Sequence, residues 1–329
     1  MTKAEKIQGK TIVITGASSG AGRAAALEFA KYQTKLVLAA RNEAVLQEVK
    51  AECEALGAQA LVVPTDTSDA KAMIALANAA NDWQGLIDVW VNNAGVLAAG
   101  DFDKTPMAVH EQVIKTNLLG YMNGAHAVMP IFKAQGYGTL INNISMGGFL
   151  PVPYGAGYTA AKFGLRGWSE ALKGELSTWK NIYVCDVFPA FLDTPGIQHA
   201  GNYTGKVLKP APPVYDPVRV AQAMVKVAAY PSANTYVGSV SMLLKLGHAV
   251  FPELMTKMTG LVMREYFKTA DPIALSDGNV FSTVDYGMST HGGFGLPGEP
   301  KAHRKYIAGA LLTGLALGCL FISQQKSRS

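Results

Sequence analysis

The sequence predicts an α/β fold, a doubly wound parallel sheet (Rossmann fold) flanked by helices, and two observations carry this prediction. Short β-branched and apolar runs alternate along the chain with longer stretches rich in Ala, Leu, Glu and Lys. The short runs are apolar without interruption, which is typical of parallel strands covered on both faces by crossover helices. Ligands of such sheets bind at the carboxyl ends of the strands, so functional residues are expected there.

Strands and helices follow one another in pairs up to residue 238. The predicted strands cover residues 11–15, 36–40, 60–63, 87–91, 139–144, 182–187 and 235–237. The predicted helices cover residues 20–32, 42–56, 68–83 and 158–179, and another runs from the Asp216-Pro217 pair towards Tyr230. Gly and Pro interrupt residues 190–215, which we interpret as a lid over the ligand.

The chain continues beyond residue 238 as a C-terminal extension whose parts differ in composition. Residues 239–270 predict helices, and residues 271–305 predict a Gly- and Pro-rich linker. Residues 306–323 carry no charge, and as a helix they would be about 27 Å long, close to the roughly 30 Å of a hydrocarbon core. Gly314 and Gly318 have a GxxxG spacing that lets helices approach closely. This hydrophobic helix is therefore expected to be either a transmembrane anchor or a helix buried in a dimer interface.

Composition and charge argue against several classes of protein. The 329 residues are 49% hydrophobic and 16% charged, which is enough apolar material for a sizeable core. Basic residues after position 300 account for the net charge of +5, so no nucleic-acid partner is expected. Three distant cysteines and six scattered histidines indicate neither a disulfide framework nor a metal site. No apolar run of signal-peptide length follows the N-terminus, so the main domain is expected in the cytoplasm.

A glycine-rich turn directly follows the first predicted strand and opens the first helix. Its sequence is Thr15-Gly16-Ala17-Ser18-Ser19-Gly20-Ala21-Gly22. In this position, backbone N–H groups and a helix N-terminus can reach a pyrophosphate. Taken alone, the turn could also be ordinary turn chemistry. The candidate cofactor contacts in it are Gly16, Ser18, Ser19, Gly20, Ala21 and Gly22.

Further motifs lie at or after the ends of later strands. The fourth strand is followed by Asn92-Asn93-Ala94-Gly95, and farther on come Asn117, Ser145, Tyr158 and Lys162. Together with the TGxxxGxG turn, this set resembles the short-chain dehydrogenase/reductase family over about residues 9–238. The resemblance implies a dinucleotide-binding and catalytic domain at residues 1–238, cofactor contacts from Asn93, Ala94 and Gly95, and a catalytic tetrad formed by Asn117, Ser145, Tyr158 and Lys162.

These residue types suit hydride transfer. Tyr158 and Lys162 are four apart and share a helix face, so the ammonium is expected to lower the pKa of the phenol, which is about 10 when unperturbed. Tyr158 would then give a proton to a carbonyl oxygen in reduction and take one from an alcohol in oxidation, while Ser145 holds the same oxygen. The resemblance further implies that Lys162 contacts the nicotinamide ribose and that Asn117 holds a water in a proton relay.

The predicted cofactor is NADP(H). The second strand ends in Ala39-Ala40-Arg41-Asn42, where no acid would bind the ribose of NAD and Arg41 suits a 2′-phosphate. The alternative for Arg41 is a solvated side chain at a helix start. Asp66 resembles the family's adenine contact, and it or Ser68 could instead cap the next helix. Pro189 and Thr194 match family positions after the sixth strand, but Ala190 stands where the family usually has glycine, which constrains the backbone there.

The expected partner is a small-molecule carbonyl or alcohol, and the resemblance implies a homo-oligomer formed through the helix of Tyr158 and its neighbouring helix. A lipophilic substrate is favoured if the apolar residues flanking the site face the cleft, and otherwise they belong to the core: Phe149, Leu150, Val152, Pro153, Tyr154, Phe191 and Leu192. Two other functions stay open. One is an NADP(H)-binding redox sensor or membrane scaffold without turnover, and the other is an epimerase or dehydratase that recycles its nucleotide.

Overall fold

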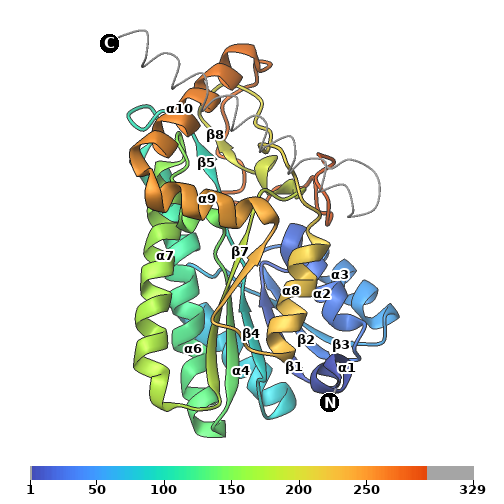
Figure 1. Ribbon diagram of the computed structural model, residues 1–329. Coiled ribbons are helices and arrows are strands. Elements are labelled where there is room, and N and C mark those ends of the chain that lie inside the picture. The colour runs from blue at the N-terminus through green and yellow to red at the C-terminus, as the bar shows by residue number, and fades with distance from the viewer. Residues whose placement is uncertain (1, 295–329) are drawn as a thin grey trace.

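A seven-stranded parallel sheet forms the centre of the protein. The computed structural model describes residues 2–294 and places the strands in the order β3-β2-β1-β4-β6-β7-β9 (Figure 1). The order reverses between β1 and β4, so ligands are expected at the carboxyl ends of these two strands. The predicted doubly wound sheet is confirmed. Its strands are β1 (Thr11–Thr15), β2 (Lys35–Ala40), β3 (Gln59–Pro64), β4 (Val89–Asn92), β6 (Gly138–Asn143), β7 (Ile182–Pro189) and β9 (Asn234–Val237).

Helices cover both faces of the sheet. One core packs against α2, α3 and α8, and the other packs against α4, α6 and α7. Figure 1 shows α6 and α7 on one side of the strands and α2 and α8 on the other. The helices up to residue 229 are α1 (Lys3–Ile7), α2 (Gly20–Ala30), α3 (Glu43–Ala55), α4 (Ala70–Gln84), α5 (Met107–Ile114), α6 (Gly120–Gln135), α7 (Ala156–Glu175) and α8 (Val218–Ala229).

Alternate side chains of each central strand enter different cores. In β1, Ile12 and Ile14 pack with the α2 and α8 side, whereas Val13 packs with the α4 and α6 side. All five residues of β1 are buried, which explains why Ile12, Val13 and Ile14 form an uninterrupted apolar run between two threonines. Burial of side chains of this size stabilises the fold by about 1.5–3 kcal/mol each.

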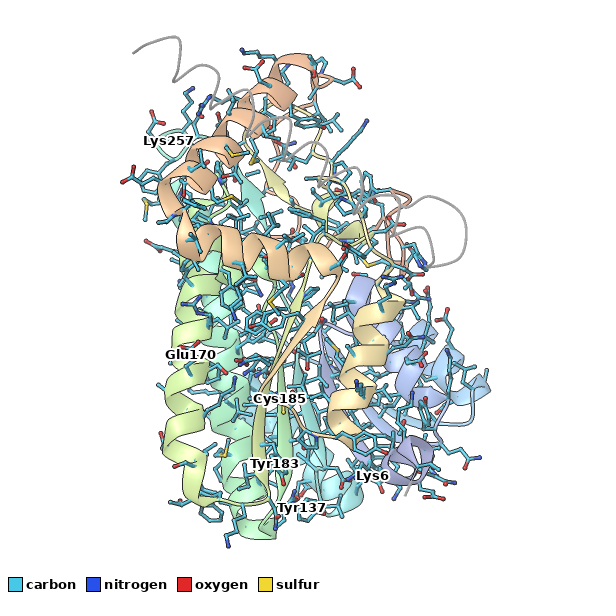
Figure 2. The ribbon with its side chains drawn as sticks, viewed as in Figure 1. Lys6, Tyr137, Glu170, Tyr183, Cys185 and Lys257 are labelled. Atoms are coloured by element: carbon cyan, nitrogen blue, oxygen red, sulfur yellow. The ribbon has the colours of Figure 1, made fainter. Side chains whose placement is uncertain are left out.

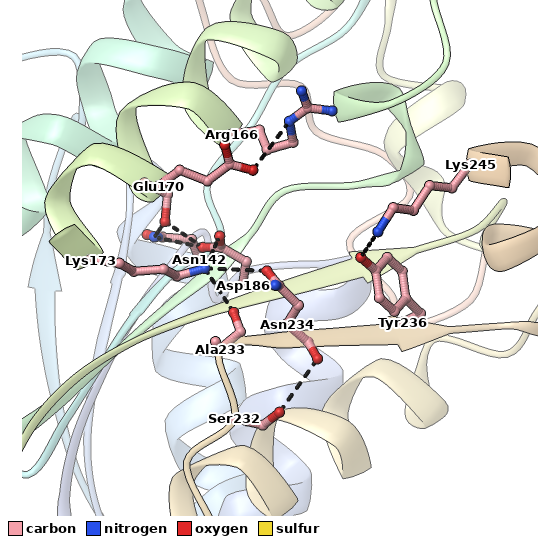
Figure 3. A network of polar contacts seen from close by, with 11 residues as sticks. Asn142, Arg166, Glu170, Lys173, Asp186, Ser232, Ala233, Asn234, Tyr236 and Lys245 are labelled. Carbon is pink, nitrogen blue, oxygen red and sulfur yellow. Dashed lines mark hydrogen bonds and ion pairs between the residues drawn. The ribbon is translucent and has the colours of Figure 1, made fainter. Parts of the chain in front are cut away.

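A buried polar network fastens α7 to the sheet (Figure 3). Asp186 of β7 is fully buried and forms an ion pair with Lys173 of α7 at 2.6 Å. The same carboxylate accepts hydrogen bonds from the Ser169 hydroxyl at 2.7 Å and from the Asn142 amide at 3.2 Å. Lys173 also donates to the carbonyl of Ala233, just before β9, at 2.8 Å. Because α7 also carries Tyr158 and Lys162, this network helps to hold the helix that presents them.

Some elements differ from those predicted. Helix α7 begins at Ala156, two residues earlier than predicted, and ends in the short turn η3 (Leu176–Thr178). Helix α5 continues into α6 through the π-helical turn η1 (Lys115–Leu119), which the apolar pattern did not indicate. Within the lid, β8 (Gly201–Asn202) pairs in parallel with β5 (Ala98–Ala99). The lid therefore has more regular structure than its Gly and Pro content predicted.

The C-terminal extension lies over the carboxyl ends of the strands. It begins with the helices α9 (Ser239–Val250) and α10 (Pro252–Thr269), which Figure 1 places above the sheet. Residues 271–294 then return to the lid, and bridges join Lys206 to Pro272 and Asn202 to Ser276. No helix within residues 2–294 is long and apolar enough to cross a membrane. The hydrophobic helix predicted at residues 306–323 lies outside the described residues, as does the end of the predicted linker.

Candidate active site

The glycine turn connects β1 to α2 and lies against the turn after β4. Gly16 and Gly20 have φ values of +66° and +54°, which glycine adopts without strain. A Cβ on Gly16 would lie 2.7 Å from the Cα of Ala94, and a Cβ on Gly22 would collide with the Gly16 carbonyl. Ser19 is the N-cap of α2, but no side chain caps this helix. The turn therefore presents backbone at a helix N-terminus, where anions bind favourably.

Asn93 connects the turn after β4 to the turn after β1, where the strand order reverses. Its side-chain amide donates to the carbonyls of Thr15 and Gly16 at 3.1 and 3.2 Å. The Thr15 hydroxyl in turn accepts hydrogen bonds from the backbone N–H groups of Asn93 and Ala94 at 2.9 and 3.2 Å. These bonds fix the carboxyl ends of β1 and β4 to each other and set the position of Gly95 beside Asn117.

Asn117 lies in η1 and is fully buried. Its amide oxygen accepts from the N–H of Val96 at 2.8 Å, and its amide nitrogen donates to the Val96 carbonyl at 2.7 Å. The side chain therefore holds the chain directly after the Asn-Asn-Ala-Gly turn. The water relay implied by the family resemblance stays a prediction, and each side-chain polar atom already makes one hydrogen bond to Val96.

Tyr158 and Ser145 come together at the carboxyl edge of the sheet. Ser145 follows β6 with a φ of +102°, a strained conformation for a residue other than glycine and one that clusters at functional sites. Its hydroxyl accepts from the N–H of Gly147 at 3.2 Å. Burial raises the pKa of Tyr158 above its usual 10.0, while the hydrogen bond with Ser145 acts in the opposite direction. The phenol is therefore protonated at neutral pH.

Lys162 is buried one turn along α7 from Tyr158. Its ammonium lies 5.7 Å from the centre of the Tyr158 ring and 5.0 Å from that of Tyr121, and it donates to the Asn143 carbonyl at 3.4 Å. Burial lowers the pKa of Lys162 from 10.5 to about 7. The net pKa of Tyr158 is raised and not lowered as expected, because desolvation is the larger effect on the phenol.

The sequence reasoning missed Tyr121 and Asn143. The Tyr121 hydroxyl donates to the Asn143 carbonyl at 2.8 Å, so one oxygen accepts from both Tyr121 and Lys162. Burial raises the pKa of Tyr121, and the neighbouring Tyr158 adds to this effect. Tyr121 follows Asn117 by four positions, a helical spacing that could have indicated a shared face. Asn143 ends β6 two residues before Ser145, and its amide donates to the Asn93 oxygen at 2.8 Å.

Arg41 and Asp66 lie beyond the ends of β2 and β3. The Arg41 guanidinium donates through Nη2 to the carbonyls of Asn279 and Ser282, at 2.6 and 3.3 Å, and is therefore not a solvated side chain. Asp66 accepts from the N–H and hydroxyl of Ser68, at 2.9 and 2.8 Å. Helix α4 is capped by Asp69, so neither Asp66 nor Ser68 is its cap.

The segment after β7 carries Pro189, Ala190 and Thr194. The N–H of Ala190 donates to the Val237 carbonyl at 2.9 Å, and its methyl group packs with Met146 and Tyr215. Alanine is therefore accommodated at the position where the family usually has glycine. Thr194 lies against the glycine turn, since a Cβ on Gly20 would be 3.2 Å from the Thr194 Cβ.

The apolar residues predicted to flank the cleft divide between core and surface. Phe149 belongs to the core, with its ring 4.8 Å from that of Phe188, and Leu150 is buried. Tyr154 packs edge to face with Phe267 of α10 at 5.0 Å, whereas Phe191 is 37% exposed. The side chains that pack against Tyr158 are a different set from that predicted: Val96, Ala98, Val109, Val113 and Val280.

Other reactive groups lie away from this edge. Cys185 lies within the sheet on β7 (Figure 2), and burial raises the pKa of its thiol to about 12, as it does for Cys53. Within residues 2–294 no cluster of His, Cys, Asp and Glu could hold a metal. A hollow of about 590 Å³ at the amino ends of the strands, beside Lys10 and Tyr137, contains none of the predicted site residues.

Comparison with known proteins decides the family. Residues 10–202 match the short chain dehydrogenase family, and this range contains the glycine turn, the Asn-Asn-Ala-Gly turn and the four residues of the tetrad. The chain belongs to the short-chain dehydrogenase family. As a short-chain dehydrogenase, it is an oxidoreductase, and the resemblance inferred from its motifs is confirmed at the level of the family.

Three relatives illustrate the range of this short-chain dehydrogenase family. An uncharacterized oxidoreductase of Bacillus subtilis, YxnA, is 33% identical over 79% of this chain and 74% of its own length. Mouse estradiol 17-beta-dehydrogenase 11 is 31% identical over 63% of this chain and 70% of its own length. A metagenomic short-chain oxidoreductase solved in complex with NADP is 28% identical, with a TM-score of 0.61 over 70% of this chain and 98% of its own.

Proposed function

We propose that this short-chain dehydrogenase transfers hydride between NADP(H) and a carbonyl or secondary alcohol, with Tyr158 as the general acid and base. The observation that carries the proposal is the meeting of Tyr158, Ser145 and Lys162 at the carboxyl edge of the sheet. This edge also holds the glycine turn, so the proton-transfer group and the nucleotide-binding turn share one site.

The residues at this edge fit a dinucleotide. Gly16 and Gly22 let the turn pack tightly, because a Cβ on either would meet backbone atoms of Ala94 or Gly16, and α2 begins there without a side-chain cap. The amide oxygen of Asn143 is buried without a hydrogen-bond partner within the described residues, which leaves an acceptor for a ligand. The proposed contacts are Gly16, Ser18, Ser19, Gly20, Ala21 and Gly22 for the phosphates, Asp66 for the adenine, and Asn93, Ala94, Gly95, Tyr158, Lys162, Pro189 and Thr194 for the nicotinamide half.

The chemistry follows from the protonation of these residues. NADP(H), when bound, supplies or accepts the hydride. In reduction, the Tyr158 hydroxyl gives its proton to the substrate oxygen, which suits a phenol that burial keeps protonated. The Ser145 hydroxyl donates a hydrogen bond to the same oxygen and fixes its position. Lys162 stabilises the phenolate electrostatically, and Asn117 keeps the Asn-Asn-Ala-Gly turn in place through Val96.

We propose NADP(H) in preference to NAD(H). The last residues of β2, Ala39 and Ala40, have no acid that would repel a 2′-phosphate, and Arg41 follows them directly. The Nη2 atom of Arg41 donates to two backbone carbonyls. The N–H donors on Nε and Nη1 lie in the same planar guanidinium, so their directions are fixed as well. A guanidinium binds phosphate oxygens in pairs, so Arg41 is the proposed 2′-phosphate contact.

A turnover assay with purified full-length chain tests the proposal. NADPH consumption, followed by its absorbance, is measured with aldehydes and ketones graded from small to lipophilic, for wild type and Tyr158→Phe. We expect Tyr158→Phe to lower kcat by about 10²- to 10⁴-fold, the usual contribution of a general acid, with NADPH binding retained. NADPH binding without turnover of any compound would instead support a redox sensor or scaffold. Substrate conversion without net loss of NADPH would support an epimerase or dehydratase.

The proposed substrate is lipophilic. The side chains packed against Tyr158 are aliphatic, and Val96, Val109 and Val113 form most of this wall. A substrate carbonyl that reaches Tyr158 would therefore bring its neighbouring atoms against apolar surface. In the graded panel, we expect kcat/KM to rise with the apolar area of the ketone. Activity restricted to small hydrophilic sugars would contradict this expectation.

We also propose that the chain associates with membranes and forms a homo-oligomer. The uncharged residues 306–323 support the membrane proposal, as do the exposed apolar side chains of α9 and α10, among them Leu246, Val250, Phe251 and Val262. The oligomer is proposed through α7, as in the family that the sequence resembles. Sedimentation equilibrium in detergent would measure the number of copies, and a monomer at all concentrations would contradict the proposal.

A further inference from the structure

The segment 276–294, here called the strap, crosses the proposed phosphate site. The N–H of Gly20, at the start of α2, donates to the Ser289 carbonyl at 2.9 Å. The Arg41 guanidinium donates to the carbonyls of Asn279 and Ser282, and the Arg23 guanidinium donates to that of Met288. Strap carbonyls therefore accept hydrogen bonds from the donors to which the proposed function assigns the pyrophosphate and the 2′-phosphate.

The strap also reaches the proposed general acid. Val280 is fully buried in the cluster of Val96, Val109 and Val113, against which Tyr158 packs. The next residue towards the N-terminus, Asn279, donates its N–H to the His199 carbonyl of the lid at 2.7 Å. One short stretch of the strap therefore covers Tyr158 and holds Arg41.

Its far end is tied to the lid beside Thr194. The Asp193 carboxylate accepts from the N–H groups of Gly292 and Phe294, at 3.1 and 2.7 Å. The Gln198 amide donates to the Gly292 carbonyl at 2.7 Å. Both ends of the strap are thus held by hydrogen bonds to the lid, and its middle, around Ser289, crosses the N-terminus of α2.

A phosphate and a strap carbonyl cannot accept the same hydrogen bond. Carbonyl oxygens carry the same sign of partial charge as phosphate oxygens, so a nucleotide phosphate next to the Ser289 or Asn279 carbonyl would be repelled until that carbonyl moves. A phosphate makes the stronger bond to a guanidinium and to a helix N-terminus because it is fully charged. Replacement of the strap carbonyls by phosphates is therefore favourable. The free energy of nucleotide binding is nevertheless reduced by the free energy needed to undock the strap.

We propose that the strap is an autoinhibitory element whose carbonyl oxygens imitate nucleotide phosphates, so that NADP(H) binding requires displacement of residues 276–294. This inference rests on the proposed function, because it assigns Gly20 and Arg41 to phosphates. The affinity of the chain for the cofactor would then depend on whether its own strap is docked or displaced. Any partner or membrane that draws the extension away from the lid would then activate the enzyme.

Hydrogen exchange on the full-length wild-type chain is the first test, since it needs no variant and no turnover. The N–H groups of Asn279, Gly292 and Phe294 donate to the lid, so they are protected while the strap is docked. We expect saturating NADPH to increase exchange of strap amides. Unchanged or stronger protection with bound NADPH would overturn the proposal, because the strap would then be indifferent to the nucleotide or would close over it.

Two glycine substitutions with a matched control test the same point by affinity. A Cβ in Gly292→Ala would lie 2.5 Å from the Thr194 carbonyl oxygen, and one in Gly278→Ala would collide with the His199 carbonyl. Gly174→Ala, at an exposed position of α7 outside the strap, is the control, because its φ is not positive and its Cβ would have no neighbour within 4 Å. If the docked strap is about ten times more populated than the free strap, we expect Gly278→Ala and Gly292→Ala to lower the Kd for NADPH about tenfold.

The outcomes separate the strap from the proposed function. A lower Kd in Gly278→Ala and Gly292→Ala but not in Gly174→Ala supports the strap. Equal or weaker binding in the two clashing variants, with NADPH still bound and consumed by wild type, overturns the strap and leaves the proposed function standing. Failure of wild type and of both clashing variants to bind NADPH overturns the cofactor proposal and the strap with it.

Discussion

Residue by residue, the chemistry of this short-chain dehydrogenase depends on burial as much as on identity. Tyr158 and Lys162 have the spacing and residue types that the motif predicts, yet desolvation raises the pKa of one and lowers that of the other. A phenol and an amine in the same buried site both favour their neutral forms. Proton transfer from Tyr158 therefore starts from a protonated phenol, and its reprotonation depends on the charge of Lys162.

The buried amine makes stability depend on pH. The pKa of Lys162 falls from 10.5 to about 7 on folding, so between these values the unfolded chain binds more protons than the folded one. This group therefore makes the free energy of unfolding rise with pH from about 7 to 10.5, and its full penalty applies below about pH 7. We expect Lys162→Met to be more stable than wild type by about 1–3 kcal/mol near pH 6, with the difference vanishing by about pH 10.

Urea unfolding across this pH range measures the difference. The exposed Lys180 provides the control, since Lys180→Met should keep the pH dependence of wild type. A Lys162→Met chain that is less stable than wild type near pH 6 would mean that the hydrogen bond to Asn143 outweighs the cost of burying the charge.

Arg41 is expected to decide between the two nicotinamide cofactors. A hydrogen bond to a charged group contributes about 1.5–3 kcal/mol, so Arg41→Ala should weaken NADPH binding by about 10- to 100-fold. NADH, which has no 2′-phosphate, should change by less than about threefold. Because the substitution also frees the strap carbonyls of Asn279 and Ser282, the ratio of the two Kd values is the informative measurement. An unchanged ratio would assign the 2′-phosphate to another residue.

Among the elements, α7 carries the catalytic pair at one end and is fastened to the sheet at the other. Asp186 is fully buried and joins α7 to β6, β7 and the start of β9 through Lys173, Ser169 and Asn142 (Figure 3). No sequence motif indicated this network, because its members come from four segments that only the fold brings together. The ends of α4 and α7 were likewise displaced from their predicted positions, since capping by Asp69 and packing against η3 are local details of the folded chain.

Removal of the Asp186 carboxylate should cost far more than loss of a surface ion pair. Asp186→Ala leaves the ammonium of Lys173 close to the interior without its counter-ion, which typically costs about 3–5 kcal/mol. Lys257→Ala breaks an exposed pair with Glu253 at 3.7 Å and should cost less than about 0.5 kcal/mol. Thermal or urea unfolding of the two variants gives the comparison. Equal, small losses would show that the network does not hold α7.

For the whole molecule, the extension after β9 changes how the catalytic domain is reached. Helices α9 and α10 lie above the carboxyl ends of the strands, and the strap returns from them across the lid, the glycine turn and Arg41 (Figure 1). On the proposed function, the cofactor would therefore meet an element that lies outside the region matched to the family, residues 10–202. Regulation and membrane association would act on the same part of the chain.

The membrane proposal has a direct test with the full-length chain. On warming a detergent solution past its cloud point, we expect the full chain to enter the detergent phase and a chain of residues 1–300 to remain in the aqueous phase, because only the former contains the uncharged segment 306–323. Circular dichroism of the shorter chain verifies that it has folded. Aqueous partition of both chains would favour the dimer-interface alternative for this segment.

The sequence by itself determined the fold class and the family and predicted where the site lies, because each depends on local patterns. Uninterrupted apolar strands, a glycine turn directly after the first of them, and the spacing of Ser145, Tyr158 and Lys162 are all properties of short segments. The tertiary structure alone decided the protonation of Tyr158 and Lys162 and the placement of Val280 and the strap against them. Burial and contacts between distant segments leave no periodic signal along the chain, so only the folded molecule specifies them.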